Sequence, residues 1–207
     1  MSRDKDQALE LFPALRGVER ELDLYEELLR RWQKRINLVG PATLDHIWLR
    51  HFADSAQLGG LAAVDAVWAD LGSGAGFPGL VIALMQKNSG GGETHLIESD
   101  LRKAAFLREV SRETGARAAI HAERAENALR HLQPAVIASR AMASMSELMA
   151  LTGPTLRRNG AIGLFLKGQN VDKELTQASI SSIFNVEIVA SKVDRAGSIV
   201  RVAPRLS

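Results

Sequence analysis

The sequence predicts an α/β fold in which a mostly parallel sheet carries an antiparallel hairpin at one edge and follows a set of N-terminal helices. Short apolar runs alternate with helical stretches from residue 61 onward, which is typical of a parallel sheet covered on both faces. Two strand-like runs at the C-terminus are separated only by a turn signal, which favours a hairpin. With 207 residues, 46% of them hydrophobic, the chain is long enough for one well-buried unit.

Residues 1–60 are predicted to form a helical extension packed on the core. Residues 18–36 have the pattern of an amphipathic helix, because apolar side chains recur at steps of three and four: Leu22, Tyr25, Leu29, Trp32 and Ile36. Pro41 interrupts this pattern, and a second helix that carries Trp48 and Phe52 is expected to end at the glycine pair that follows.

The core, residues 61–207, is predicted as strands that lead into helices, and we expect it to form one compact unit with the extension. The expected strands cover residues 64–71, 94–97, 118–121, 135–139, 161–166, 186–193 and 198–203. The expected helices begin at Pro78 and cover residues 101–114, 125–131, 146–158 and 171–182. A turn over residues 194–197 joins the last two strands into the edge hairpin.

The composition excludes several classes of protein. The chain has no cysteine, which excludes a disulfide framework, a cysteine-ligated metal and a cysteine nucleophile. Its formal net charge of +2 neither requires nor forbids a nucleic-acid partner. No apolar leader follows the polar start, and the apolar runs are far shorter than the roughly 20 residues of a membrane span, so we expect a cytoplasmic protein without a membrane partner. The histidines have no metal-ligand spacing, so no metal is expected.

A glycine-rich segment lies between a predicted strand and a predicted helix and reads Asp70-Leu71-Gly72-Ser73-Gly74-Ala75-Gly76-Phe77-Pro78-Gly79. Its alternating glycines let the backbone approach a ligand closely, and the following helix offers free N–H groups. It lacks the Lys-Ser/Thr pair of a phosphate loop, which argues against nucleoside triphosphate hydrolysis. The pattern resembles the binding loop of class I S-adenosylmethionine (SAM) methyltransferases. The resemblance implies contacts from Gly72 and Gly74, with Asp70 serving the cofactor's amino-acid end directly or through water; the alternative is a turn needed only for packing.

Acidic residues also follow the second and third predicted strands. An acid at the tip of the second strand can accept hydrogen bonds from both ribose hydroxyls of a nucleoside, and Glu98 holds that place. Asp100 is a rival for this role, with the alternative that it caps the helix over residues 101–114. After the third strand, Ala125 and Glu126 fall where such enzymes contact the adenine ring, although the same stretch is a good helix start.

Missing motifs narrow the reaction. Methylation of a pyrimidine carbon usually needs a cysteine, and methylation of an exocyclic amine usually needs an Asn/Asp-Pro-Pro-aromatic motif after the fourth strand. That place reads Ile137-Ala138-Ser139-Arg140-Ala141-Met142, without an acid or a proline pair. An oxygen nucleophile must lose a proton and therefore wants a general base. N7 of guanine carries a lone pair and no proton, so alignment and desolvation suffice, and we assign no catalytic base.

Over nearly its whole length the chain resembles the bacterial 16S rRNA guanine-N7 methyltransferases of the RsmG family, also called glucose-inhibited division protein B. The resemblance rests on the blocks Trp32–Leu38, Arg50–Ser55, Asp70–Gly79, Ile137–Ala141 and Leu166–Gln169. It implies the class I methyltransferase fold, SAM as methyl donor, and one guanine in the decoding-region loop of 16S rRNA as acceptor. Carried over by position, the family's cofactor contacts fall on Gly72, Phe77, Ala125, Glu126 and Arg140. Phe77 stands where many relatives have leucine, and the connection over residues 88–92 is longer than usual.

Basic side chains form a candidate rRNA footprint on the first long helix: Arg30, Arg31, Lys34 and Arg35. They can neutralise phosphates if they share the face of the cofactor site. The alternative is a solvated helix face with ordinary helical ion pairs.

Three further residues are substrate candidates: Arg50, His51 and Lys167. Arg50 extends the basic cluster. His51 is either a contact to substrate or cofactor, or a buried imidazole that holds Asp54. Lys167 follows the fifth strand at the edge where ligands of open α/β sheets sit, and it either binds an rRNA phosphate or closes the strand.

Two other functions stay open on the residues alone. A SAM-dependent methyltransferase of a small molecule is compatible with the modest charge, and a non-catalytic regulator that binds SAM or a nucleotide would share the same loop. The rRNA interpretation names 16S rRNA, the small ribosomal subunit or its assembly intermediate as the partner of a monomeric enzyme.

Overall fold

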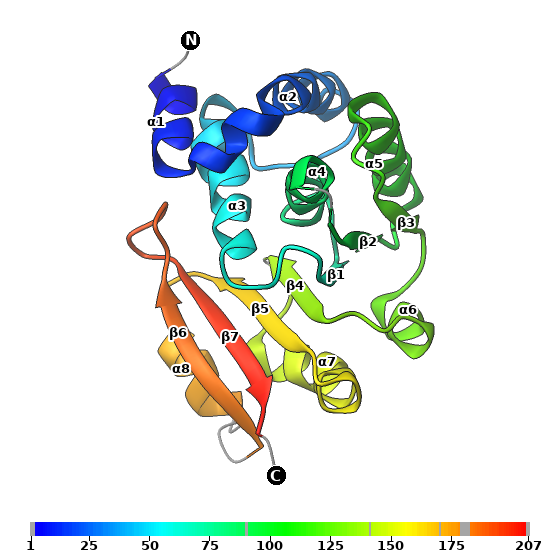
Figure 1. Ribbon diagram of the computed structural model, residues 1–207, viewed down its shortest axis with the longest axis vertical. Helices are drawn as coiled ribbons and strands as arrows, with labels where there is room; N and C mark the ends of the chain where they lie inside the picture. Colours follow the sequence, from blue (N-terminus) through cyan, green and yellow to red (C-terminus); the bar gives the residue numbers. More distant parts are fainter. Residues whose placement is uncertain (1–2, 90, 141, 170, 179–182, 206–207) are drawn as a thin grey trace.

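The structure, a computed structural model, describes residues 3–89, 91–140, 142–169, 171–178 and 183–205. Its strands are β1 (Val67–Leu71), β2 (Glu93–Ile97), β3 (Ala119–His121), β4 (Val136–Arg140), β5 (Ile162–Lys167), β6 (Phe184–Ala190) and β7 (Ser198–Pro204). They form one sheet in the order β3-β2-β1-β4-β5-β7-β6 (Figure 1). The pairs among β1 to β5 are parallel, and β7 runs antiparallel between β5 and β6. The predicted α/β sheet with an antiparallel edge hairpin is therefore confirmed.

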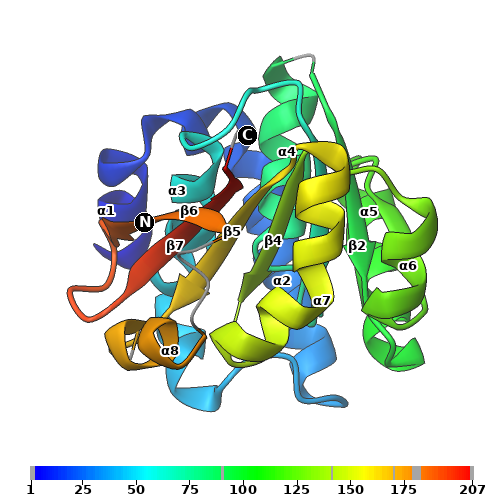
Figure 2. The same ribbon diagram turned by 90° about the horizontal axis from the view of Figure 1, so that it is seen from below.

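A helix follows each parallel strand, as the alternation predicts. These helices are α4 (Gly79–Ser89), α5 (Leu101–Thr114), α6 (Ala125–His131), α7 (Met145–Asn159) and α8 (Val171–Ala178). In Figures 1 and 2, α4 and α5 lie on one face of the sheet, whereas α6, α7 and α8 lie on the other. Helix α7 begins with a capping box between Ser144 and Glu147 and ends at Gly160, whose φ is +66°. Local signals thus determine where this helix starts and stops.

The N-terminal segment packs on the same face as α4 and α5. It contains α1 (Arg3–Leu11), α2 (Glu19–Gln33), α3 (Asp54–Gly59), 3-10 helices at Pro13–Val18 and Pro41–His46, and a π-helix at Trp48–Ala53. Leu22, Tyr25 and Leu29, on the predicted apolar face of α2, are fully buried in one cluster with Phe77 and Phe106. Each such side chain stabilises the fold by about 1.5–3 kcal/mol, so α2 is part of the core that supports the glycine loop.

Two local features differ from the sequence prediction. The single helix expected around Trp48 and Phe52 is instead a 3-10 helix, a π-helix and α3. Helix α1 forms in a polar stretch where the sequence predicts no helix. A tertiary contact links the two differences, because the Asp4 carboxylate of α1 accepts hydrogen bonds from the N–H groups of Trp48 at 2.9 Å and Leu49 at 3.4 Å. Asp4 thereby satisfies N–H groups at the start of the π-helix that otherwise need a partner.

Parts of the prediction fall outside the described residues: the end of the last helix over 179–182, Ala141 of the fourth-strand block, and Gly90 of the connection over 88–92. Within the described ranges, no helix has both the length and the apolar character that crossing a lipid bilayer requires.

Candidate active site

The carboxyl ends of β1, β2 and β4 meet at one edge of the sheet. Leu71 is in register with Ile97 of β2 and with Ser139 of β4. The residues that follow these three are therefore neighbours at that edge: Gly72, Glu98 and Arg140. The fold therefore brings together residues predicted from three separate segments. They lie at the edge where ligands of open α/β sheets bind.

The loop between β1 and α4 has the backbone geometry that its glycines predict. Gly72, Gly74 and Gly76 have φ values of +65°, +55° and +91°, a region that residues with a Cβ rarely adopt. A Cβ at Gly76 would lie 2.5 Å from both the Tyr25 hydroxyl and Leu80 Cδ1. At Gly74 the space is open, since a Cβ there would have the Gly72 carbonyl oxygen as its nearest neighbour at 3.8 Å. Gly74 therefore presents bare backbone to a ligand.

Asp70, near the end of β1, is 1% exposed and anchors the loop to α4. Its Oδ2 accepts the N–H of Gly79 at 3.0 Å, and its backbone oxygen accepts the Ser73 hydroxyl at 2.9 Å. Burial raises the pKa of Asp70 to about 6, against the hydrogen bond from Gly79. Its Oδ1 is buried with no hydrogen-bond partner among the described residues. A buried carboxylate with an open acceptor site is a group that a cationic ligand stabilises.

Glu98 and Asp100 are both candidates for the acid beside the cofactor, and the structure gives them different positions. Glu98 Oε2 accepts the Gly74 N–H at 2.9 Å and Oε1 accepts the Asp100 N–H at 2.7 Å. Asp100 Oδ1 accepts the N–H of Arg102 at 2.8 Å, which makes it the cap of α5. Glu98 is therefore the acid that lies against the glycine loop.

The two residues predicted to contact adenine lie at the start of α6. The Glu98 N–H donates to the His121 carbonyl at 3.0 Å, which joins the end of β2 to the end of β3. A short connection then leads to Ala125, which is half-buried, and Glu126, which is exposed. Both residues follow β3 at the same edge of the sheet as Glu98.

The groups at this edge fit SAM in their chemistry. Gly74 allows close approach, Glu98 carries oxygens that can accept from ribose hydroxyls, and the buried Asp70 carboxylate places negative charge behind the loop. Met142, in the segment after β4, lies on the loop, because a Cβ on Gly72 would come 2.8 Å from its Sδ. Met142 therefore forms a wall of the candidate cofactor site.

Arg140 lies within a largely buried polar cluster. Its Nη1 lies 2.8 Å from His51 Nδ1, 3.3 Å from the Arg50 carbonyl oxygen and 3.6 Å from Asp54 Oδ2. Its Cζ lies 4.9 Å from the centroid of the Phe77 ring, a cation–π contact. The Phe77 ring is 2% exposed and packs inside the protein, so a contact from Phe77 to the cofactor would come from its backbone. Arg140 thus joins β4, the glycine loop and the π-helix.

His51 is held between Arg140 and Thr43. A guanidinium can only donate, so His51 Nδ1 accepts, and Nε2 carries the proton and donates to Thr43 Oγ1 at 2.9 Å. The ring also stacks on Phe77, with centroids 4.7 Å apart. His51 is thus the buried, hydrogen-bonded imidazole of the second alternative, but its partners are Arg140 and Thr43, and Asp54 pairs with Arg140 instead.

The environment of His51 predicts a stability that depends on pH. Burial, followed by the charges of Arg140 and Arg50, lowers the pKa of His51 from 6.5 to about 3. Below pH 6.5 the unfolded chain therefore takes up a proton that the folded protein refuses, and stability falls as the pH falls toward 3. We measure the free energy of unfolding by urea denaturation between pH 7.5 and 5. As the pH falls, this free energy is expected to decrease in wild type by up to about 1.4 kcal/mol per pH unit more than in His51→Asn. The exposed His46, changed to Asn, controls for loss of an imidazole, and parallel profiles for wild type and His51→Asn would contradict the lowered pKa.

An open cleft of about 560 Å³ adjoins this cluster, with Arg140, Met142 and Asp194 among its walls. A smaller cavity of about 160 Å³ continues from it around His51. Arg50, predicted as a substrate contact, lies at the rim, where its Nη1 bonds Asp194 Oδ2 at 2.8 Å. The cleft is therefore bounded on one side by the β6–β7 connection that carries Asp194.

Lys167 lines the same cleft, but its ammonium group is occupied. Its Nζ donates to Glu174 Oε2 of α8 at 2.8 Å and to the Ala143 carbonyl, and its side chain is 8% exposed. These contacts favour the alternative in which Lys167 closes the strand.

The basic cluster of α2 is exposed at its C-terminal end. Arg31, Lys34 and Arg35 are exposed, and Arg31 makes a loose ion pair with Glu27 at 3.9 Å. Arg30 is engaged by Glu26 and by the Leu44 carbonyl. Arg31, Lys34 and Arg35 are therefore the members of the cluster that remain accessible to a phosphate backbone.

The sequence predicted no place in the functional site for Thr43, Met142 or Asp194. Asp194 stands in a turn signal, and Met142 in a segment singled out only for what it lacks. Thr43 precedes the Arg50–Ser55 block, so no local pattern connects it with His51. Only the proximity of these segments in the fold identifies the three residues.

Solved structures share the fold. Ribosomal protein L11 methylase from Lactobacillus delbrueckii subsp. bulgaricus has a TM-score of 0.58 and 13% identity over 76% of this chain and 79% of that protein. An rRNA methylase from Streptococcus thermophilus has a TM-score of 0.55 and 10% identity over 73% and 94%. At such identities the likeness concerns the class I methyltransferase fold alone.

Sequence comparison is more specific. The family described as rRNA small subunit methyltransferase G (GidB) matches residues 18–198. Ribosomal RNA small subunit methyltransferase G of Rhodospirillum centenum is 51% identical over 203 residues, which are 94% of this chain and 91% of the relative. The protein of the same name from Parvibaculum lavamentivorans is 46% identical over 199 residues, 93% and 88% of the two chains. The chain therefore belongs to the rRNA small subunit methyltransferase G family, the RsmG family that its sequence blocks resemble.

Proposed function

We propose that this protein transfers the methyl group of SAM to N7 of one guanine in the decoding-region loop of 16S rRNA. Membership of the rRNA small subunit methyltransferase G family supports the enzyme class, the donor and small-subunit rRNA as substrate. The choice of acceptor atom rests on the site, and the observation that carries it is the state of His51.

His51 is unsuited to act as a general base. Both of its ring nitrogens are used in hydrogen bonds, one of them to Arg140, and its pKa is lowered to about 3. The acids that line the cleft each pair with a basic side chain: Asp54, Glu174 and Asp194. An acceptor that must lose a proton would find these groups already engaged. N7 of guanine presents a lone pair without a proton, so positioning suffices.

The chain's own residues would then bind, orient and desolvate. SAM, when bound, supplies an electrophilic methyl group on a sulfonium ion. Glu98 accepts from the ribose, Gly74 allows the close approach, and Met142 covers the loop against water. The ion pairs of Asp54 with Arg140 and of Asp194 with Arg50 hold these side chains in place at the cleft, so that the walls around the acceptor base are set before it binds.

Mapping the methylated atom tests the proposal. The protein is incubated with labelled SAM and either unmodified 16S rRNA or unmodified 30S particles, and the RNA is then cleaved chemically at N7-methylguanine. We expect label at one guanine of the decoding region. Label at an exocyclic amine or a pyrimidine would overturn the acceptor assignment. Turnover only with a small molecule, or SAM binding without turnover, would support the two alternative functions instead.

The exposed residues at the end of α2 predict a salt effect on rRNA binding. Each phosphate contact contributes a slope of about −0.7 to −0.9 in log affinity against log salt. Changing Arg31, Lys34 and Arg35 to Gln is therefore expected to flatten the slope by about 2.1–2.7 in filter binding with 16S rRNA. Calorimetric SAM affinity is expected to stay unchanged, because these side chains precede the sheet.

A second triple variant provides the matched control. Arg112 and Arg157 lie in the last turns of α5 and α7, and Arg117 precedes β3. All three are exposed and lie toward the amino ends of the strands, opposite the ends that carry the glycine loop. Their change to Gln removes equal charge and is expected to keep the wild-type slope. Equal slopes for the two triple variants would make the α2 cluster a solvated helix face.

A further inference from the structure

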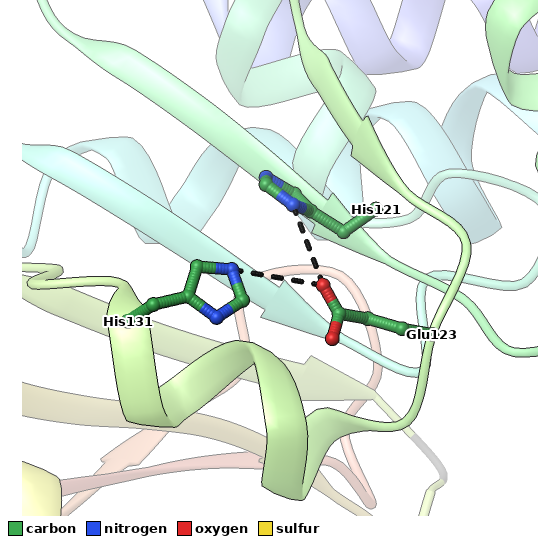
Figure 3. A group of neighbouring side chains, drawn as sticks. All are labelled: His121, Glu123 and His131. Carbon is green, nitrogen blue, oxygen red and sulfur yellow. Dashed lines mark ion pairs between the residues drawn. The ribbon is translucent and has the colours of Figure 1, made fainter.

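The end of β3 and helix α6 bring together three side chains that the proposed methyl transfer does not use. His121 ends β3, Glu123 lies in the connection, and His131 lies in the last turn of α6. Figure 3 shows the three side chains pointing toward one another, with the carboxylate facing both imidazoles. Glu123 Oε1 lies 3.8 Å from His121 Nδ1 and 3.6 Å from His131 Nε2. The three possible ligand atoms all lie within 4.8 Å of one another.

We propose that His121, Glu123 and His131 bind a divalent transition-metal ion of the Zn²⁺ class. Two imidazole nitrogens and one carboxylate oxygen are a ligand set that Zn²⁺ takes in sites with an open position, at bond lengths of about 2.0–2.2 Å. Around a tetrahedral ion of that radius, ligand atoms lie about 3.4 Å apart. Small side-chain shifts of His121 and His131 toward Glu123 therefore suffice to close the site. The open fourth position faces solvent, since the His131 side chain is 55% exposed.

His95 of β2 orients His121 for this role. His95 Nδ1 lies 3.0 Å from His121 Nε2. When His121 Nε2 carries the proton and donates to His95, the lone pair of His121 Nδ1 faces the candidate site. His95 Nε2 then carries its own proton toward Glu93 Oε1, 3.9 Å away. Metal-ligating histidines usually donate their second N–H to a carboxylate, a backbone carbonyl or water, which fixes the tautomer and the ring orientation. Here His95 Nδ1 takes the place of that acceptor.

The candidate metal site and the cleft lie at different strands of the sheet. β3 is the outermost strand on the side opposite the β6–β7 hairpin, so a metal there takes no part in the transfer step. It would instead link the last turn of α6, through His131, to the end of β3, through His121. Helix α6 is short and begins with Ala125 and Glu126, so the bound ion would stabilise the segment predicted to contact adenine.

Zn²⁺ itself is the probe. Chelator-treated, untagged full-length protein is titrated with ZnCl₂ by calorimetry, with MgCl₂ in parallel, and Co²⁺ is added to a second sample to record visible absorption. We expect one Zn²⁺ to bind per chain and Mg²⁺, which prefers oxygen ligands, to give no heat of binding. With Co²⁺ we expect the visible absorption bands of a tetrahedral site. Absence of Zn²⁺ binding by the wild-type protein would overturn the proposal.

Variants locate the ion. Because the His131 side chain is half-exposed, His131→Ala is expected to fold normally and to weaken Zn²⁺ binding by more than about tenfold, as is Glu123→Gln. His46→Ala removes an exposed imidazole at the end of the 3-10 helix Pro41–His46, outside the candidate metal site, and is the control. Zn²⁺ should raise the melting temperature of wild type and His46→Ala but not of His131→Ala. Equal Zn²⁺ affinity in the His131 and His46 variants would overturn the site, and neither result depends on methyl transfer.

Discussion

Replacing Arg140 with glutamine is expected to lower the free energy of unfolding by about 1–3 kcal/mol and to abolish methyl transfer. The guanidinium is the counter-charge of Asp54. Burial raises the pKa of Asp54, and the charges of Arg140 and Arg50 oppose that shift. It also donates to His51 Nδ1. The variant would leave the Asp54 carboxylate with only the charge of Arg50 and the hydrogen bond from Gln57 Nε2 at 2.8 Å, and it would leave the His51 acceptor unpaired. Both losses are costly in the interior. Urea denaturation measures the first effect, and methylation of 30S particles the second.

A double variant separates stability from function. Arg140→Gln combined with Asp54→Asn removes the carboxylate that has lost its Arg140 partner, so most of the lost stability is expected to return, while methyl transfer stays absent. Arg201→Gln is the control, because Arg201 forms an exposed pair with Glu187 at 3.6 Å worth less than about 1 kcal/mol. If Arg140→Gln destabilises no more than Arg201→Gln, the buried cluster does not support the fold.

Adding a single methyl group at Gly74 is expected to weaken SAM binding by more than about tenfold, equivalent to about 1.4 kcal/mol. The Cβ of Gly74→Ala would project into open space beside the loop, where the bare backbone allows a ligand to approach. The positive φ of +55° also strains alanine, at a cost of about 1–2 kcal/mol. Calorimetry with SAM and thermal denaturation measure the two effects separately.

Gly160 is a matched control for the backbone strain. Its φ is +66°, and a Cβ there would meet nothing within 4 Å, whereas at Gly74 the nearest atom is the Gly72 carbonyl oxygen at 3.8 Å. It ends α7, away from the glycine loop. Gly160→Ala should therefore lower the melting temperature about as much as Gly74→Ala while leaving SAM affinity at the wild-type value. A similar loss of SAM affinity in both variants would mean that strain, and not occupation of the cofactor's space, is responsible.

The sequence by itself determined the architecture and most of the candidate cofactor residues. Apolar periodicity distinguishes strands from helices, because each element has its own repeat of side-chain direction. Once the alternation implies a parallel sheet, strand ends must share an edge, which is why Gly72, Glu98 and Arg140 could be expected together. The glycines of the loop carry their own explanation, since positive φ is a property of the residue and needs no partner.

Only the tertiary structure decided which polar atoms meet. The stability of α1, the π-helix around His51 and the inward packing of the Phe77 ring all depend on contacts between segments far apart in the chain. The same holds for the group formed by His121, Glu123 and His131, whose spacing matches no local metal motif. Periodicity determines which face of an element is buried. The partner of a polar side chain, and with it the pKa and ligand of that side chain, is decided by distance and burial, which exist only when separate elements pack together.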